Sequence, residues 1–189
     1  MTSADLAQKV KARFPQFPQT EFRDEISLTV PLEEIEATCK ACRDELGFNF
    51  LVDVSSVDHM GEEPRFEVVY GLYSLADHIH LRLKTKVSED NLEVPTVSHL
   101  WATADWHERE IFDMMGIRFA NHPDLRRILM WDGYPFFPLR KDFPLEGKPS
   151  DLPEVAFSDR APLAGGPFVT SPNPGGTKDR EPRAHPPDI

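Results

Sequence analysis

Helical spacing of apolar residues occurs twice in the first fifty residues. Leu6, Val10 and Phe14 stand four residues apart and predict a short helix over residues 3–14. A second stripe predicts a helix over residues 31–47, which begins at a proline and ends at a glycine, each at its favoured position. The apolar residues of this second stripe are Leu32, Ile35, Cys39, Cys42 and Leu46.

Alternation of apolar and polar residues predicts four strands, over residues 26–30, 48–54, 66–72 and 79–87. Short links rich in turn-forming residues predict hairpins between the last three strands, which would make them antiparallel neighbours. The residues expected to share the inner face are Phe48, Phe50, Val52 and Val54, then Phe66, Val68, Tyr70 and Leu72, then Ile79, Leu81, Leu83 and Val87. The pattern therefore predicts an α+β fold, a mostly antiparallel sheet of about four strands with helices packed on one face.

The composition changes after residue 145. Half of the 18 prolines lie between residues 149 and 189, together with two Gly-Gly pairs, and no regular spacing of apolar residues remains. Such a segment buries too little surface to repay the entropy cost of ordering by itself. We therefore expect an α+β domain over residues 1–145, and over residues 146–189 an extended arm that becomes ordered along a partner. The alternative is a plain disordered tail.

Charge and hydropathy exclude several classes of protein. The net charge of −11 argues against nucleic acid as a main partner, because phosphate binding needs a basic face. A hydrophobic content of 40% and a charged content of 28% are typical of a soluble globular protein. The chain has no apolar run long enough to span a membrane and no secretory core at its N-terminus. We expect it on the cytoplasmic side of a membrane or in the cytoplasm.

Candidate metal ligands and reactive thiols are few. Cys39 and Cys42 form a C-x-x-C motif, but both lie on the apolar stripe of the predicted helix, which favours two small core residues over a redox or zinc site. With no other cysteine, a cysteine-ligated iron–sulfur cluster is not expected. His78 and His80 share one side of a predicted strand with basic residues, so we expect a polar face and no metal. Asp58 is expected to be an ordinary turn or surface residue.

The segment from Trp106 to Pro144 concentrates charges, aromatic residues and turn signals. A helix is predicted up to Met115, with Thr103 or Asp105 as its N-cap, Gly116 as its C-terminal stop and an i, i+4 ion pair between Arg109 and Asp113. A short strand over residues 117–119 follows. Three prolines over residues 135–144 then favour an extended, aromatic-rich loop, whose composition is typical of protein–protein interfaces.

Two motifs in this segment are similar to those of a known family. The first consists of Glu108, Arg109, Glu110, Asp113, Met114 and Met115, followed by His122, Arg126, Ile128 and Leu129. The second is Pro-Leu-Arg-Lys-Asp-Phe-Pro-Leu at residues 138–145, and the loop at residues 132–137 departs from the family pattern. In order and spacing the two motifs resemble the C (thirty-kilodalton) subunit of the proton-translocating NADH:quinone oxidoreductase, respiratory complex I.

The resemblance implies a function for the whole chain. It implies a docking subunit without a cofactor in the peripheral arm of the complex, on the cytoplasmic side of the inner (plasma) membrane. FMN and iron–sulfur clusters would lie in partner subunits and carry electrons from NADH to ubiquinone or another quinone. The expected partners are the large quinone-site subunit and its iron–sulfur neighbour. The residues expected to fix the fold and dock are Glu108, Arg109, Glu110, Asp113, His122, Arg126, Arg127, Arg140, Lys141 and Asp142.

Two alternatives remain open from the sequence. The chain can be the equivalent subunit of a membrane-bound hydrogenase-type complex. It can also be a stand-alone enzyme in which Glu108, Asp113 and His122 serve as acid–base or metal-binding groups. Otherwise we expect no catalytic, cofactor-binding or metal-binding residues in this chain.

Overall fold

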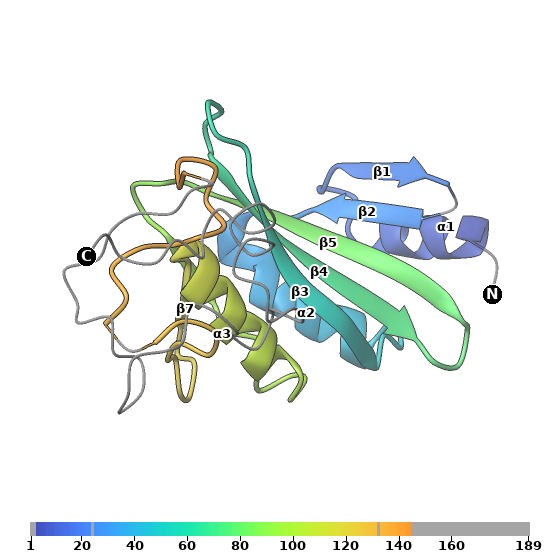
Figure 1. The fold of residues 1–189 in the computed structure, drawn as a ribbon. Coiled ribbons are helices and arrows are strands. Elements are labelled where there is room, and N and C mark those ends of the chain that lie inside the picture. Colours follow the sequence, from blue (N-terminus) through green and yellow to red (C-terminus); the bar gives the residue numbers. More distant parts are fainter. Residues whose placement is uncertain (1–2, 24, 132, 145–189) are drawn as a thin grey trace, which may run out of the picture. The chain divides into compact units, whose positions relative to one another are not determined.

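The computed structural model describes residues 3–23, 25–131 and 133–144 (Figure 1). The chain divides into two units, with the boundary between Leu129 and Met130. The elements of the first unit follow the order α1 (Ser3–Arg13), β1 (Gln19–Phe22), β2 (Glu25–Thr29), η1 (Leu32–Glu34), α2 (Ile35–Asp44), β3 (Phe50–Asp58), β4 (Phe66–Ser74), β5 (Ile79–Val87), β6 (Glu93–Pro95), α3 (Ala104–Met115) and β7 (Arg118–Ala120).

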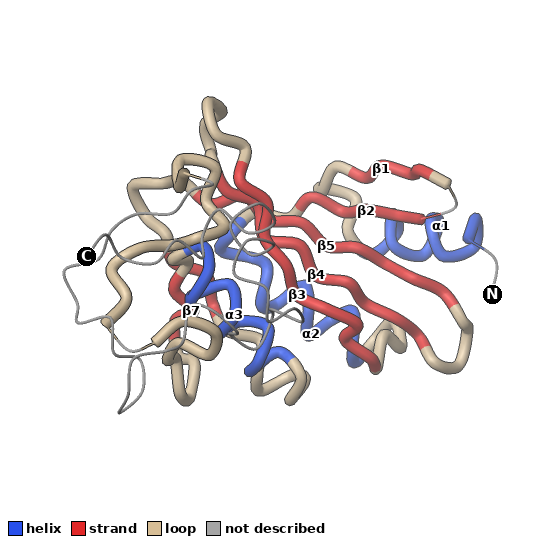
Figure 2. The backbone as a smooth tube through the Cα atoms, viewed as in Figure 1, coloured by secondary structure: helices blue, strands red, loops and turns tan. Residues whose placement is uncertain are grey.

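Five strands form the main sheet, in the order β1-β2-β5-β4-β3. Only the pair β2–β5 is parallel, so the sheet is mostly antiparallel as predicted. Figure 2 shows α1 and α2 on the same side of this sheet. The predicted α+β fold is therefore confirmed, with one strand more than expected. Strand β1 was missed because its four residues are polar or exposed and carry no alternation. Strands β6 and β7 form a separate short parallel pair, of which only β7 was predicted.

The core lies between the sheet and its helices. All four residues predicted to face inward from β4 are buried, and so are Leu81, Leu83 and Val87 from β5. The prediction for β3 is wrong in part, because Phe50 and Val52 are each 44% exposed while Leu51 and Val54 are buried. The pairing of β3 with β4 shifts its register between Leu51 and Asp53. An extra residue in a strand reverses the face of the residues before it, and alternation in the sequence cannot reveal that shift.

Two further local predictions are settled by the described residues. Cys39 and Cys42 are buried on the inner side of α2, as the helical stripe predicted. His78, in contrast, does not lie on a strand. It occupies the turn before β5 with a φ of 57°, and its Nδ1 lies 3.1 Å from the Tyr73 hydroxyl. The predicted arm over residues 146–189 lies outside the described residues.

The described part of the second unit is a loop with clustered aromatic rings. Trp131 packs edge-on against Tyr134, and Tyr134 against Phe136, with ring centroids 4.6 and 5.6 Å apart. The guanidinium of Arg140 lies 4.6 Å from the centre of the Phe137 ring. The aromatic-rich loop is as predicted, but its backbone forms turns, closed by N–H groups of Tyr134, Arg140 and Phe143 that donate three residues back, so it is not extended throughout.

Candidate functional site

Helix α3 carries the first half of the first motif, and three of the four charged residues in that half are buried. Gly116 ends the helix in the left-handed conformation, with a φ of 77°, and its N–H donates to Phe112 O. This is the predicted C-terminal stop. Thr103 occupies the N-cap position, but its side chain makes no capping hydrogen bond, so the expected side-chain cap is wrong. Apolar residues and the charged side chains of Glu108, Arg109 and Asp113 share the buried face.

Asp113 joins the end of α3 to the segment over residues 127–129. Its Oδ1 lies 2.5 Å from Arg127 Nη1, and its Oδ2 accepts hydrogen bonds from the N–H groups of Ile128 at 3.0 Å and Leu129 at 2.6 Å. Arg127 also donates to the carbonyl oxygen of Asp113 at 2.9 Å. The carboxylate thus pairs with an arginine fourteen residues away, and the predicted i, i+4 pair with Arg109 is wrong.

Glu108 joins the middle of α3 to the segment after β6. Its Oε1 accepts the N–H of Val97 at 2.7 Å, and its Oε2 lies 2.5 Å from the Thr96 hydroxyl. Burial raises the pKa of Glu108 to about 7, and the charge of Asp105 adds to the rise, whereas the bonds from Thr96 and Val97 oppose it. This carboxyl group therefore holds two segments together in the interior.

His122 connects the same helix to the turn that follows β7. Its Nδ1 accepts the N–H of Asp124 at 3.1 Å, so Nε2 is the donor, and it lies 3.2 Å from Asp105 O. The same Nε2 lies 3.0 Å from Asp105 Oδ1 and 3.8 Å from Glu108 Oε2. The structure thus brings His122 near Glu108, as a folding contact within the chain.

Arg109 links the buried and exposed sides of α3. Its Nε donates to Arg126 O at 3.3 Å, and its guanidinium lies 4.9 Å from the centre of the Trp106 ring. Trp106 is exposed, and Glu110, one turn further along the helix, is exposed as well. Arg126 is also exposed and pairs with Asp124 at 2.8 Å. An exposed tryptophan held by a guanidinium, beside exposed carboxylate and guanidinium groups, is typical of a contact surface.

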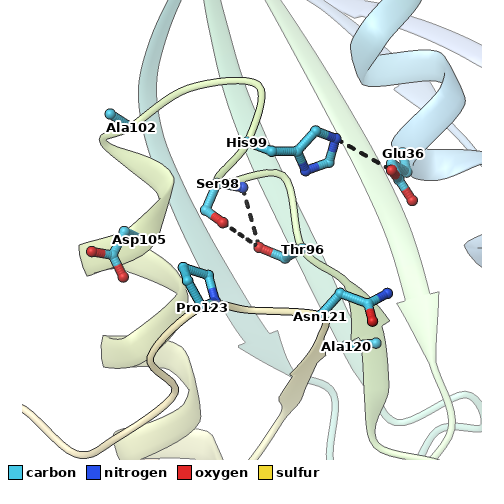
Figure 3. Close-up of a pocket in the computed structure, with 9 residues that line it drawn as sticks. All are labelled: Glu36, Thr96, Ser98, His99, Ala102, Asp105, Ala120, Asn121 and Pro123. Atoms are coloured by element: carbon cyan, nitrogen blue, oxygen red, sulfur yellow. Dashed lines mark hydrogen bonds and ion pairs between the residues drawn. The ribbon is translucent and has the colours of Figure 1, made fainter.

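A pocket of about 630 Å³ adjoins these contacts (Figure 3). Asp105 from α3 and Thr96 from the loop after β6 reach it, and Figure 3 shows an ion pair between His99 and Glu36 from α2 on another side. The distance from His99 Nε2 to Glu36 Oε1 is 3.3 Å. Asn121 from the segment after β7 lines the pocket as well, so polar groups reach it from four segments of the chain.

The predicted site residues of the first unit thus fall into two groups. The buried or largely buried side chains of Glu108, Arg109, Asp113, His122 and Arg127 bond within the chain, while Glu110 and Arg126 face solvent. In the second unit, Lys141 and Asp142 are exposed and Arg140 is half-buried. Sequence reasoning missed Thr96 and Val97, because no spacing in residues 88–103 marks them as partners of α3.

Within residues 3–23, 25–131 and 133–144, no group of three or more histidine, cysteine, aspartate or glutamate side chains is placed to hold a metal ion. In the same part of the chain, no helix has both the length and the apolar character needed to cross a bilayer.

Comparisons with known proteins agree with the two motifs. A family model described as respiratory-chain NADH dehydrogenase, 30 Kd subunit, matches residues 28–149. The C subunit of the NADH-quinone oxidoreductase of Geotalea uraniireducens (strain Rf4) is 50% identical over 127 residues, which cover 67% of this chain and 77% of that protein. The C subunit from Geobacter sulfurreducens (strain ATCC 51573 / DSM 12127 / PCA) is 48% identical over 128 residues, with 67% and 79% covered.

Two solved structures share the fold. A trypsin-resistant fragment (1-134) of Nqo5 aligns with a TM-score of 0.58 at 30% identity, over 66% of this chain and all of that one. A chain of the membrane-bound sulfane sulfur reductase, an archaeal respiratory membrane complex, aligns with a TM-score of 0.68, over 75% of this chain and 85% of that one. Its identity of 22% shows a common fold alone.

Proposed function

The chain belongs to the family of the 30 Kd subunit of respiratory-chain NADH dehydrogenase, and we propose that it docks subunits together in that enzyme complex without holding a cofactor itself. The observation that carries the proposal is that the motif's buried carboxylates bond to other segments of this chain. Glu108 and Asp113 are fully buried and bonded to backbone N–H groups, so they hold the fold and do not face a substrate.

In this proposal the motif residues have two roles. The buried or largely buried members Glu108, Arg109, Asp113, His122 and Arg127 fix the shape of the surface around α3. The more exposed members Glu110, Arg126, Arg140, Lys141 and Asp142 contact partner subunits. Exposed charges at an interface set specificity and association rate more than affinity, whereas an exposed aromatic side chain such as Trp106 supplies contact area.

The partners proposed for these surfaces are the large quinone-site subunit and its iron–sulfur neighbour. FMN and iron–sulfur clusters would remain in partner subunits, and the chain would lie on the cytoplasmic side of the inner membrane. The names of the relatives near 50% identity support the NADH-linked complex over the hydrogenase-type alternative. The stand-alone enzyme is less well supported, because Glu108 and Asp113, two of its three candidate groups, are buried and bonded within the chain.

Gentle affinity purification of the tagged chain from detergent-solubilised membranes tests the proposal. We expect mass spectrometry to identify the large quinone-site subunit and its iron–sulfur neighbour, with NADH:quinone activity in the same fraction. A lone monodisperse chain with turnover or metal of its own would contradict the proposal.

A charge reversal tests the contact surface on α3. Glu110→Lys is expected to lower the amount of assembled complex several-fold while turnover per assembled complex stays the same. Glu33→Lys, at an exposed glutamate of η1, is the matched control and should change neither quantity. Equal assembly of the two variants would exclude Glu110 from the interface.

A further inference from the structure

The connection between β3 and β4 projects beyond the neighbouring strands (Figure 1), and a buried ion pair holds its base. Arg65 Nε and Nη2 donate to Asp58 Oδ1 and Oδ2, each at 2.9 Å. The side chains are 9% and 2% exposed respectively, which overturns the expectation that Asp58 is an ordinary surface residue. The N–H of His59 donates to Arg65 O at 2.8 Å and continues the ladder past the last paired residues of the strands.

Further contacts hold Arg65 from two more directions. Its Nη1 donates to Glu89 Oε1 at 2.8 Å, which ties the hairpin to the segment after β5. Its guanidinium also lies 4.8 Å from the centre of the Phe66 ring. The planar group is therefore fixed in position and orientation, and through it the base of the hairpin.

The buried pair of Asp58 and Arg65 is better explained by the direction that it gives to the hairpin than by added stability. Burying two charges costs several kcal/mol of desolvation, on the order of what their attraction returns, so such a pair adds little net stability over apolar residues of similar size. Turn residues alone are enough to close a short hairpin. The pair is therefore better explained by the fixed direction that it imposes on residues 60–64.

The tip carries an apolar side chain beside negative charge. Met60 is 56% exposed, and Glu62 and Glu63 are exposed as well. Gly61 has a φ of 94°, which favours glycine, and the N–H of Glu62 donates to His59 O at 2.8 Å, so the turn has an ordered backbone. Among the described residues, neither glutamate forms an ion pair, so both charges remain available to a partner.

We propose that residues 60–63 form a docking tip that inserts into a hollow of another subunit of the same complex, with an apolar floor for Met60 and lysine or arginine at its rim. The proposal rests on the proposed function for the existence of that complex. Charge complementarity selects the occupant, because the tip presents two carboxylates and no basic group. A flexible, polarisable methionine fits an apolar hollow without demanding an exact shape. The buried ion pair reduces the entropy lost on binding by holding the tip in advance.

Photo-crosslinking locates the tip in the assembled complex. A benzophenone amino acid replaces Met60 in one preparation and Leu75 in another, where Leu75 is the matched control because it is 53% exposed in the turn between β4 and β5. From position 60 we expect a crosslink to a peptide of another subunit that contains lysine or arginine, in several-fold greater yield than from position 75. Crosslinks only within this chain, or equal yields from the two positions, would overturn the proposal.

Charge reversal provides an independent measurement. The double variant Glu62→Lys and Glu63→Lys is expected to lower recovery of partner subunits at least threefold, with an unchanged far-ultraviolet circular dichroism spectrum because both side chains are exposed. Unchanged recovery while the wild-type chain recovers its partners would refute the docking tip and leave the proposed function standing. Failure of the wild-type chain to recover any subunit would refute both.

Discussion

Replacement of Asp113 by alanine tests the conclusion that the motif's buried charges hold the fold. The change leaves the guanidinium of Arg127 and the N–H groups of Ile128 and Leu129 without the acceptor that they share. Removing one partner of a buried ion pair costs about 3–5 kcal/mol, and each buried N–H left unpaired costs about 1–3 kcal/mol. These costs are not incurred in full, because Arg127 and Leu129 lie close enough to the surface for water to replace part of the lost hydrogen bonding. We expect a loss of about 3–5 kcal/mol in the free energy of unfolding.

Urea denaturation of the purified full-length chain measures this loss. With a slope near 2 kcal/mol per molar urea, a loss of that size lowers the midpoint by about 2 M. Asp124→Ala is the matched control, because Asp124 pairs with Arg126 at the surface, where an ion pair is worth about 0–1 kcal/mol. Asp113→Asn keeps an oxygen for the N–H groups, so its free energy of unfolding should lie between those of the two alanine variants.

Free energies of unfolding within about 1 kcal/mol of each other for the two alanine variants, the upper limit expected for a surface pair, would refute the structural role of Asp113. That result would mean that the segment over residues 127–129 is held by other contacts. Asp113 would then no longer be assigned to the interior of the fold and would again be a candidate for contact with a partner subunit.

Two further predictions concern buried titratable groups. The pKa of Glu108 is raised from 4.5 to about 7, so the folded chain binds more protons than the unfolded chain between these values. The free energy of unfolding should therefore fall by about 3 kcal/mol as the pH rises from about 4.5 to 7, and denaturation of Glu108→Gln should show a flatter dependence over that window. Burial also raises the pKa of Cys42 to about 12 and that of Cys39 well above its usual value. Both thiols should react with Ellman's reagent at pH 8 only after unfolding, and rapid reaction in the native chain would contradict their place in the core.

Elements whose spacing is regular were predictable from the sequence. Strand β4 buries the residues that its period selects, because the strand period is a local property of the chain. Helix α2 is shorter than the predicted helix over residues 31–47 and buries Ile35, Cys39 and Cys42 of the stripe, whereas Leu32 and Leu46 lie outside it and are half-buried. Two of the departures have clear physical causes. The register shift in β3 depends on pairing with β4, and β1 is held at the sheet edge by pairing with β2, so neither is visible in its own residues.

The sequence was sufficient to predict which residues belong to the candidate site. It was not sufficient to predict which of them form hydrogen bonds and ion pairs with one another. Arg109 stands at the helical spacing that predicts a pair with Asp113, yet Arg127 takes that position from a segment fourteen residues away. A hydrogen bond between segments depends on where the chain returns, which single-sequence spacing does not encode. The same limit concealed the pairing of Glu108 with Thr96 and Val97.

These contacts change where an interface should be sought. Glu108 and Asp113 stand out in the sequence, but both are fully occupied inside the chain, so their substitution will act on folding before it acts on binding. Exposed groups beside them, such as Trp106 and Glu110, can change a partner's affinity while the fold remains intact. A variant that lowers assembly without lowering the free energy of unfolding therefore identifies the docking surface, whereas a variant that lowers both identifies only its support.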